Sequence, residues 1–198
     1  MTRPGRPAGP AADTEAIVLT AALELLLAEG ATALTPQRVH AATGVARSTV
    51  YRHWPTPREF LAALIAVAPH PAAHPTGDLA ADLHAEVDGL CDRLRDKPVA
   101  AFLRALVTAS ATDPTCGDLR VRYVRDLLAP FHTVLRAQLP EDVAATEIDE
   151  AVDAIVAPLL VDALLLDAPV DRDRAHRAVE HTLGRLAVPP GTTQESAP

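Results

Sequence analysis

Aromatic residues are scarce in this chain of 198 residues, where three Phe, two Tyr and one Trp make up 3% of the composition. The only methionine is Met1. A ligand cavity lined by many aromatic rings is therefore excluded, and any pocket is expected to be lined mainly by Leu, Val and Ala.

The sequence has only two cysteines and no long apolar run. Cys91 and Cys116 stand alone without a CxxC pair, which excludes a zinc ribbon or a disulfide scaffold. Pro158 and Asp162 interrupt the longest apolar stretch, residues 154–166, which stays below the roughly 18 residues of a membrane span. The first ten residues lack the apolar core of a signal peptide. We therefore expect a cytoplasmic, nucleoid-associated protein with no membrane partner.

The common motifs of enzymes are missing as well. The sequence has no GxGxxG, no phosphate-binding GxxxxGK[ST], no GxSxG and no HExxH. We expect no catalytic residue, no metal and no cofactor, and a helical enzyme remains the less favoured alternative.

What the chain does contain favours helices. Hydrophobic residues make up 48% and charged residues 22%, and alanine alone is about a fifth of the chain. Neither strand alternation nor an internal repeat is visible. The positions of proline, glycine and capping residues predict an all-α fold of about nine helices. Their expected ranges are 13–30, 36–42, 46–53, 56–67, 78–95, 98–111, 116–138, 147–166 and 171–187.

The same breaks predict the domain organisation. A flexible arm (1–12) precedes a first domain (13–67), a linker (68–77) rich in proline and histidine, a second domain (78–187) and a disordered tail (188–198). The net charge of the whole chain is −8. Residues 1–60 carry six Arg against five acids, a balance of +1, so the remaining residues carry −9. If the protein binds DNA, only the N-terminal third offers a suitable face.

Residues 34–60 contain a helix-turn-helix pattern. Thr35 is a side-chain cap and Pro36 suits the first helical position, while Gly44 permits a tight turn before the second short helix. That second helix presents Arg, Tyr and hydroxyl side chains, which suit phosphate contacts and base reading in a major groove.

In these residues the sequence resembles the TetR family of bacterial transcriptional regulators. The resemblance spans about residues 17–64 and is carried by Gly30, Thr35, Val39, Ala42, Gly44, Val45, Thr49, Tyr51, His53, Trp54 and Pro55. It implies an N-terminal three-helix DNA-binding domain and a C-terminal helical domain for ligand binding and dimerisation.

The resemblance also implies roles for single residues. Arg47, Ser48 and Thr49 would face bases or nearby phosphates, and Tyr51 and His53 would bind phosphates. The start of the preceding helix, Thr35 and Gln37, would place its N–H groups on a phosphate. Arg3 and Arg6 would reach the minor groove from the arm.

Three positions depart from the family pattern, and one of them is His40, where the family usually has a small residue. Ala46 replaces the usual serine, which removes a side-chain cap worth roughly 1 kcal/mol. Pro57 replaces a lysine, so that Arg58 would have to supply the phosphate contact. Trp54 is expected to pack rather than touch DNA.

The second domain offers candidates for a ligand pocket and a dimer interface. His84, Asp88 and Cys91 share one helix face, where a metal or thiol-sensing site competes with plain packing, and the other pocket candidates are Phe102, Tyr123, Phe131 and His132. Apolar bands on the last two helices predict a homodimer through a four-helix bundle. These bands comprise Val152, Ile155, Val156, Leu159, Leu160, Ala163, Ala175, Val179 and Leu183.

The favoured function is a repressor that a small molecule releases from a palindromic double-stranded DNA operator. The effector is not identified by the sequence. A constitutive or architectural DNA-binding protein without a ligand is the second hypothesis.

Overall fold

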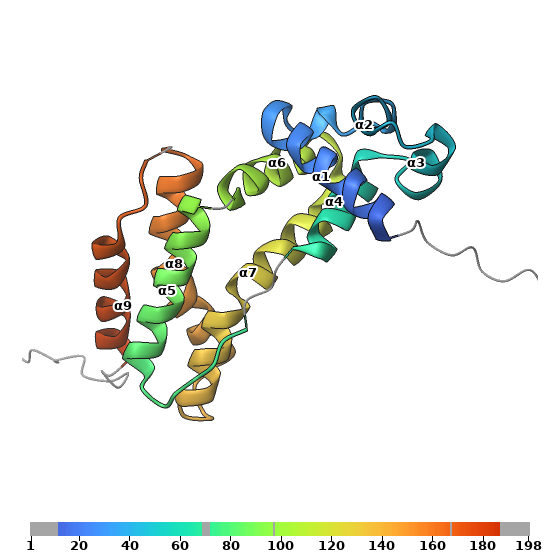
Figure 1. The fold of residues 1–198 in the computed structure, drawn as a ribbon. Coiled ribbons are helices and arrows are strands. Elements are labelled where there is room, and N and C mark those ends of the chain that lie inside the picture. Colours follow the sequence, from blue (N-terminus) through green and yellow to red (C-terminus); the bar gives the residue numbers. More distant parts are fainter. Residues whose placement is uncertain (1–11, 69–71, 97, 167, 187–198) are drawn as a thin grey trace, which may run out of the picture. The chain divides into compact units, whose positions relative to one another are not determined.

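A computed structural model describes residues 12–68, 72–96, 98–166 and 168–186. Within these ranges the regular structure is helical, which confirms the all-α prediction (Figure 1). Two short 3₁₀ turns, η1 (Ala31–Ala33) and η2 (Pro114–Cys116), were not expected from the sequence. The α-helices are α1 (Ala12–Glu29), α2 (Pro36–Thr43), α3 (Arg47–His53), α4 (Pro57–Val67), α5 (Leu79–Asp96), α6 (Val99–Thr112), α7 (Gly117–Gln138), α8 (Ala145–Leu164) and α9 (Arg172–Leu186).

Capping chemistry explains where the helices begin. The Thr35 hydroxyl accepts a hydrogen bond from the Arg38 amide, with Pro36 at the first position of α2. At α8 the Glu147 carboxylate accepts from the Ala144 amide at 3.1 Å, so this helix begins at Ala145, two residues earlier than expected.

The chain divides into two compact units that do not coincide with the expected domains. The first is Met1–His70 with Ala101–Asp126, and the second is Pro71–Ala100 with Leu127–Pro198. Helix α6 and the first half of α7 therefore pack with α1 to α4 rather than with the rest of the expected domain 78–187. The chain therefore passes between the two units at the linker, again near residue 100 and once more within α7.

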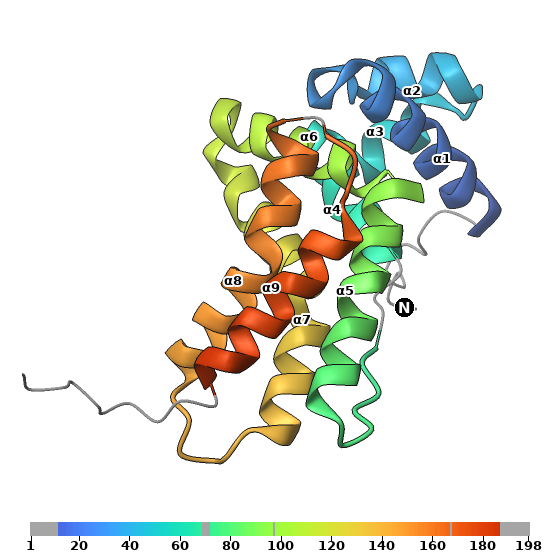
Figure 2. The ribbon, with the colours of Figure 1, turned by 90° about the vertical axis from the view of Figure 1, so that its left-hand side faces the viewer.

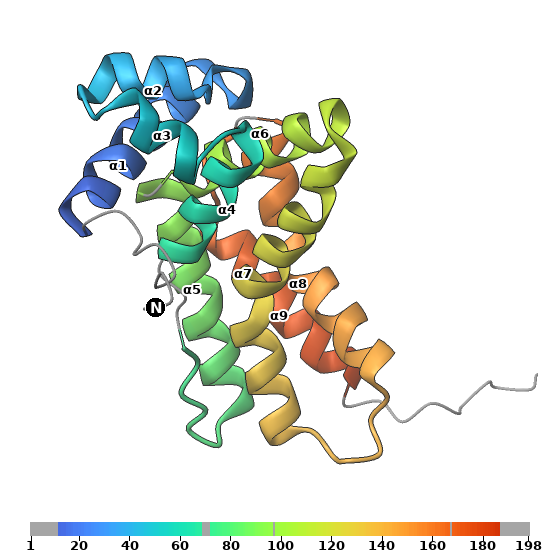
Figure 3. The same cartoon turned by 90° about the vertical axis from the view of Figure 1, so that its right-hand side faces the viewer.

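The first unit has one continuous apolar core. Phe60 and Ile65 of α4 are fully buried, and they belong to the same cluster as Phe102 and Leu106 of α6 and Leu119 of α7. Helices α1 to α4 alone would bury little apolar surface, because a small domain buries a smaller fraction of its surface than a large one. The contribution of α6 and α7 completes this core, on which α1 to α4 pack (Figure 3).

The second unit consists of α5, the end of α7, α8 and α9, with α9 lying against both α5 and α8 (Figure 2). Phe131 of α7 is its largest fully buried side chain. Asp162 of α8 is buried, and the Arg174 guanidinium donates to both of its oxygens, at 2.7 and 2.5 Å. Pairing removes the cost of an isolated buried charge.

The structure places most of the residues predicted for the dimer interface in the core of the second unit. An apolar band on an amphipathic helix looks the same whether it meets its own chain or a partner. Here the bands on α8 and α9 form the core of the second unit, so these side chains have little surface left for a second chain. Among the predicted residues, Leu160 and Leu183 are half-buried. The other seven are at most 7% exposed, namely Val152, Ile155, Val156, Leu159, Ala163, Ala175 and Val179.

Among the helices that the structure describes, none combines the length and the apolar character needed to cross a lipid bilayer.

Candidate nucleic-acid interface

The turn between α2 and α3 is closed by a small network of hydrogen bonds. Gly44 adopts φ 68°, and its amide donates to the His40 carbonyl at 2.9 Å. His40 Nδ1 in turn donates to the Val45 carbonyl at 2.7 Å. The Thr43 hydroxyl donates to the Val39 carbonyl at 2.8 Å and accepts from the Val45 amide at 3.2 Å. A side chain would strain the left-handed backbone of Gly44, so glycine sets the angle between the two helices.

One side of helix α3 packs into the core of the first unit, and the opposite side is exposed to solvent. Val50 is fully buried in the core of the first unit. Trp54, just after α3, is 4% exposed and stacks on Phe60 with ring centroids 6.0 Å apart, which confirms its expected packing role. The opposite side of α3 faces solvent, with Arg47, Ser48, Tyr51 and Arg52 exposed and Thr49 and His53 half-buried.

Two of these exposed residues form a pair. The Arg47 guanidinium lies over the Tyr51 ring at 5.0 Å from its centroid, and Nη2 donates to the Tyr51 hydroxyl oxygen at 3.4 Å. A cation over an aromatic face is electrostatically favourable. The Tyr51 hydroxyl keeps its own hydrogen for an anionic acceptor, so the pair offers two donor groups on the same face.

Local charge also favours a polyanion at this surface. Residues 30–58 contain four arginines and no Asp or Glu, in a chain with 26 acids against 18 basic residues. Arg38 is paired with Glu29 of α1. The hydrogen bond from Arg38 lowers the pKa of Glu29 below its usual value. The exposed Arg47 and Arg52 therefore dominate the charge of the solvent side of α3.

The other predicted DNA contacts lie outside α3, at the start of α2, at the start of α4 and in the N-terminal arm. Thr35 caps α2, and Gln37 is exposed in the first turn of the same helix. Arg3 and Arg6 lie outside the described residues. Arg58 is engaged within the protein, since its Nε donates to the Thr115 carbonyl at 2.9 Å and its Nη2 to Asp118 at 2.7 Å.

The lost cap at Ala46 is visible in the structure. The Thr49 and Val50 amides bond to the Ala46 carbonyl at 2.9 and 3.1 Å, but no side chain caps the helix. The first amides of α3 are therefore available to an external acceptor such as a phosphate.

Comparison with known families accounts for both parts of the chain. A family model described as bacterial regulatory proteins, tetR family, matches residues 18–64. A second model, described as tetracyclin repressor-like, C-terminal domain, matches residues 73–182, which is more than half of the chain. The chain belongs to the TetR family. It is a transcriptional regulator with a DNA-binding N-terminal domain and a ligand-binding C-terminal domain.

Solved structures of TetR regulators have the same fold. A TetR transcriptional regulator from Agrobacterium tumefaciens is 25% identical with a TM-score of 0.67, over 88% of this chain and 94% of that one. The TetR family regulator SCO0332 is 29% identical with a TM-score of 0.64, over 87% and 97%. The multidrug binding protein EbrR, complexed with proflavin, is 21% identical with a TM-score of 0.59, over 85% and 98%, and shows the fold alone. No curated protein matches the chain.

The pocket residues expected in this TetR regulator fall into separate places. Phe102 and Tyr123 lie in the first unit, in an edge-on contact with centroids 4.9 Å apart. The others belong to the second unit. There Phe131 is fully buried, and His132 bonds to the Leu128 carbonyl at 3.1 Å and to Asp149 at 3.0 Å.

The face of α5 that carries His84, Asp88 and Cys91 packs on α9. The His84 ring stacks on His176 with centroids 4.6 Å apart, and His176 Nε2 donates to Asp88 at 2.9 Å. Cys91 is 1% exposed, and burial raises the pKa of its thiol, which lowers the fraction of reactive thiolate. Among the described residues no cluster suited to a metal ion occurs. Sequence spacing did not reveal His176, because only the packing of α9 on α5 brings it here.

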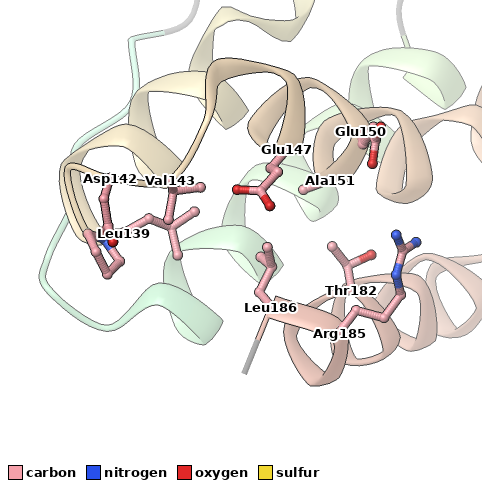
Figure 4. A pocket seen from close by; sticks show the side chains of 10 residues that line it. Leu139, Asp142, Val143, Glu147, Glu150, Ala151, Thr182, Arg185 and Leu186 are labelled. Carbon is pink, nitrogen blue, oxygen red and sulfur yellow. The ribbon is translucent and has the colours of Figure 1, made fainter. Parts of the chain in front are cut away.

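A cavity of about 450 Å³ opens in the second unit between the α7–α8 connection, α8 and α9 (Figure 4). Leu139, Val143 and Leu186 contribute apolar surface, while Glu147 and Arg185 project from α8 and α9 (Figure 4). The rest of its lining is Pro140, Asp142, Glu150, Ala151 and Thr182. None of these residues was a pocket candidate in the sequence, because the cavity forms only where residues 139–151 meet residues 182–186, two stretches that are well separated along the chain.

Proposed function

We propose that this TetR regulator represses transcription by binding a palindromic DNA operator as a homodimer, and that a small molecule releases it. The observation that carries the proposal is the solvent side of α3. The buried Val50 anchors this helix in the core. Its exposed side chains are Arg47, Ser48, Tyr51 and Arg52. A short helix with this face suits a major groove, where arginine reads guanine and hydroxyls bind phosphates.

Thr49 and His53 belong to the same proposed contact surface, as do Thr35 and Gln37 at the start of α2. The uncapped amides after Ala46 add donors that a phosphate can use. The chain binds DNA only through this local surface, since its net charge is −8. We therefore expect selective binding and weak affinity for unrelated DNA.

The proposed dimer uses the outward sides of α8 and α9, in place of the buried bands predicted from the sequence. Small or apolar residues are exposed there, namely Ala157 and Val161 on α8 and Gly184 on α9. Small residues let helices from two chains approach closely, and a two-fold axis would place the two α3 helices on successive half-sites. Val161→Glu should give a monomer by light scattering, whereas the same change at the buried Val152 should instead unfold the protein.

Release follows from differential binding. A ligand that prefers the protein conformation with mismatched α3 spacing shifts the population away from the operator. In this proposal the chain binds and does not catalyse. Helix α4 directly follows α3 and ends at Val67, where the linker to the second family domain begins, so it is the proposed connection.

The decisive experiment is fluorescence anisotropy of the purified protein with DNA that flanks its own gene. Scrambled DNA and a salt series are run in parallel. We expect selective binding whose log affinity falls linearly with log salt concentration. Tyr51→Ala should abolish this selective binding, whereas Val107→Thr, at an exposed position of α6 outside the proposed DNA and dimer surfaces, should leave it unchanged. Equal affinity for scrambled DNA would favour the architectural alternative.

A thermal shift screen separates the ligand-responsive regulator from a constitutive one. A compound that binds only the native state must raise the unfolding temperature. The same compound should lower operator affinity in the anisotropy assay. Compounds that stabilise the protein without affecting operator binding would contradict the proposed release.

A further inference from the structure

Arg58 is a cation at the start of α4 that the protein itself pairs with a carboxylate. It is the second residue of α4 and lies five residues after the end of the DNA-reading helix α3. Its guanidinium donates from Nε to the Thr115 carbonyl at 2.9 Å and from Nη2 to Asp118 Oδ2 at 2.7 Å. All three residues belong to the first compact unit, so this contact is internal to the unit that carries α3.

The ion pair is held loosely. The Arg58 side chain is 34% exposed and that of Asp118 is 63% exposed. Pairs with such exposure are screened by water and salt and contribute little to stability. Asp118 also lies in the first turn of α7, where the helix dipole favours a carboxylate even without a cation beside it. Breaking the pair therefore leaves neither charge buried.

A phosphodiester is a close chemical substitute for the Asp118 carboxylate. Both present two oxygens to the planar fork of a guanidinium, and arginine binds either through paired hydrogen bonds. The residue that precedes Arg58 is Pro57, which has no charge to contribute. At the start of α4, Arg58 is thus the side chain able to bind a phosphate, provided that it leaves Asp118.

We propose that Asp118 competes with a DNA phosphate for Arg58 and thereby lowers the affinity of the regulator for DNA. Without DNA, the guanidinium stays on Asp118. In the complex it exchanges this carboxylate for a backbone phosphate and keeps its charge. The inference rests on the proposed operator binding and adds an autoinhibitory residue outside the helix-turn-helix.

A purely architectural ion pair predicts a different pattern. If Arg58 only tied α4 to α7, removing either partner would weaken DNA binding through the same loss of structure. Competition instead predicts opposite effects of the two substitutions. It also predicts that the effect of Asp118 disappears once Arg58 is gone, because the coupling passes through that side chain.

The test is a double-mutant cycle of wild type, Arg58→Gln, Asp118→Asn and the double variant, with operator DNA over a potassium chloride series. Because the proposed dimer carries two copies of each residue, the expected effects are given per subunit. Arg58→Gln should reduce the slope of log affinity against log salt by about 0.9 per subunit, or about eightfold in affinity at 0.1 M salt. Asp118→Asn should raise affinity by about two- to fivefold per subunit. In the Arg58→Gln background the same change should alter affinity by less than about 1.5-fold.

Three controls make the outcome specific. Arg58→Lys keeps the charge and should keep the wild-type salt slope. Glu24→Gln removes an exposed acid of α1 in the same unit, so its long-range effect should be equal in both backgrounds. Urea unfolding followed by the fluorescence of Trp54, which is buried in this unit, establishes that each variant is folded.

An unchanged salt slope in folded Arg58→Gln overturns the proposal, and so does an Asp118→Asn gain that persists without Arg58. Wild-type protein that binds no sequence selectively would instead refute the operator function itself, before any variant is compared.

Discussion

Replacing Gly44 by alanine tests the geometry of the helix-turn-helix directly. The residue has φ 68°, and a Cβ added there would meet no heavy atom within 4 Å. The cost is therefore one of backbone conformation, about 1–2 kcal/mol for a non-glycine residue in the left-handed region. Alanine regains about 0.4–1 kcal/mol by restricting the unfolded chain, which leaves a net destabilisation of about 1 kcal/mol.

Gly117 is the matched control. Its φ is −64° at the start of α7 in the same unit, and its added Cβ also meets nothing within 4 Å. Gly117→Ala should therefore stabilise the protein by about 0.4–1 kcal/mol, because only the unfolded-state term remains. The same substitution thus changes sign between the two sites.

Urea unfolding followed by Trp54 fluorescence measures both variants, since the only tryptophan is buried in this unit. With a slope of about 1–3 kcal/mol per M, Gly44→Ala should lower the midpoint by about 0.3–1 M. Gly44→Asn should cost less, because asparagine tolerates the left-handed region. A Gly44→Ala midpoint equal to or above that of wild type would refute the left-handed turn.

Three further predictions concern the core, the linker and the DNA surface. Phe131→Ala should destabilise the second unit by about 3–5 kcal/mol in a denaturant titration followed by circular dichroism, whereas loss below 1 kcal/mol would mean that Phe131 is not buried as described. Burial disfavours the charged form of Asp82, but hydrogen bonds from Thr76 and Gln138 outweigh it and lower the Asp82 pKa. Its stabilisation should be complete above about pH 4 and decline as pH falls further, so that Asp82→Asn converges with wild type in acid and a constant gap would contradict the assignment. Tyr51→Phe should weaken operator binding by about 1.5 kcal/mol, roughly tenfold, because the hydroxyl bond to a charged phosphate is lost, and unchanged affinity would remove Tyr51 from the interface.

Local signals in the sequence located the helices well. Thr35 with Pro36, Gly44, and Thr56 with Glu59 are each read within one turn of backbone, and the structure shows them at the helix ends. The Glu59 carboxylate accepts from the Thr56 amide at 3.1 Å, as a capping box requires. Helix ends are determined by nearby hydrogen bonds, so short-range patterns are sufficient for them.

Contacts between residues that are distant in the sequence could not be predicted from such short-range patterns. The amphipathic bands of α8 and α9 predicted a dimer interface, yet Ile155 and Val179 are fully buried within the chain. Arg58 was expected to bind phosphate, and its observed partner Asp118 lies sixty residues away. His176 stacks on His84 although nothing in their spacing indicates contact.

The sequence by itself determined the helical fold, the helix-turn-helix and the likeness to TetR regulators, because propensity, capping and apolar periodicity act over a few residues. The tertiary structure alone decided that α6 and the start of α7 complete the core of the DNA-reading unit and that Asp118 holds Arg58. The physical reason is that hydrophobic burial is non-directional, so an apolar stripe specifies that it must be covered, while only packing selects the element that covers it.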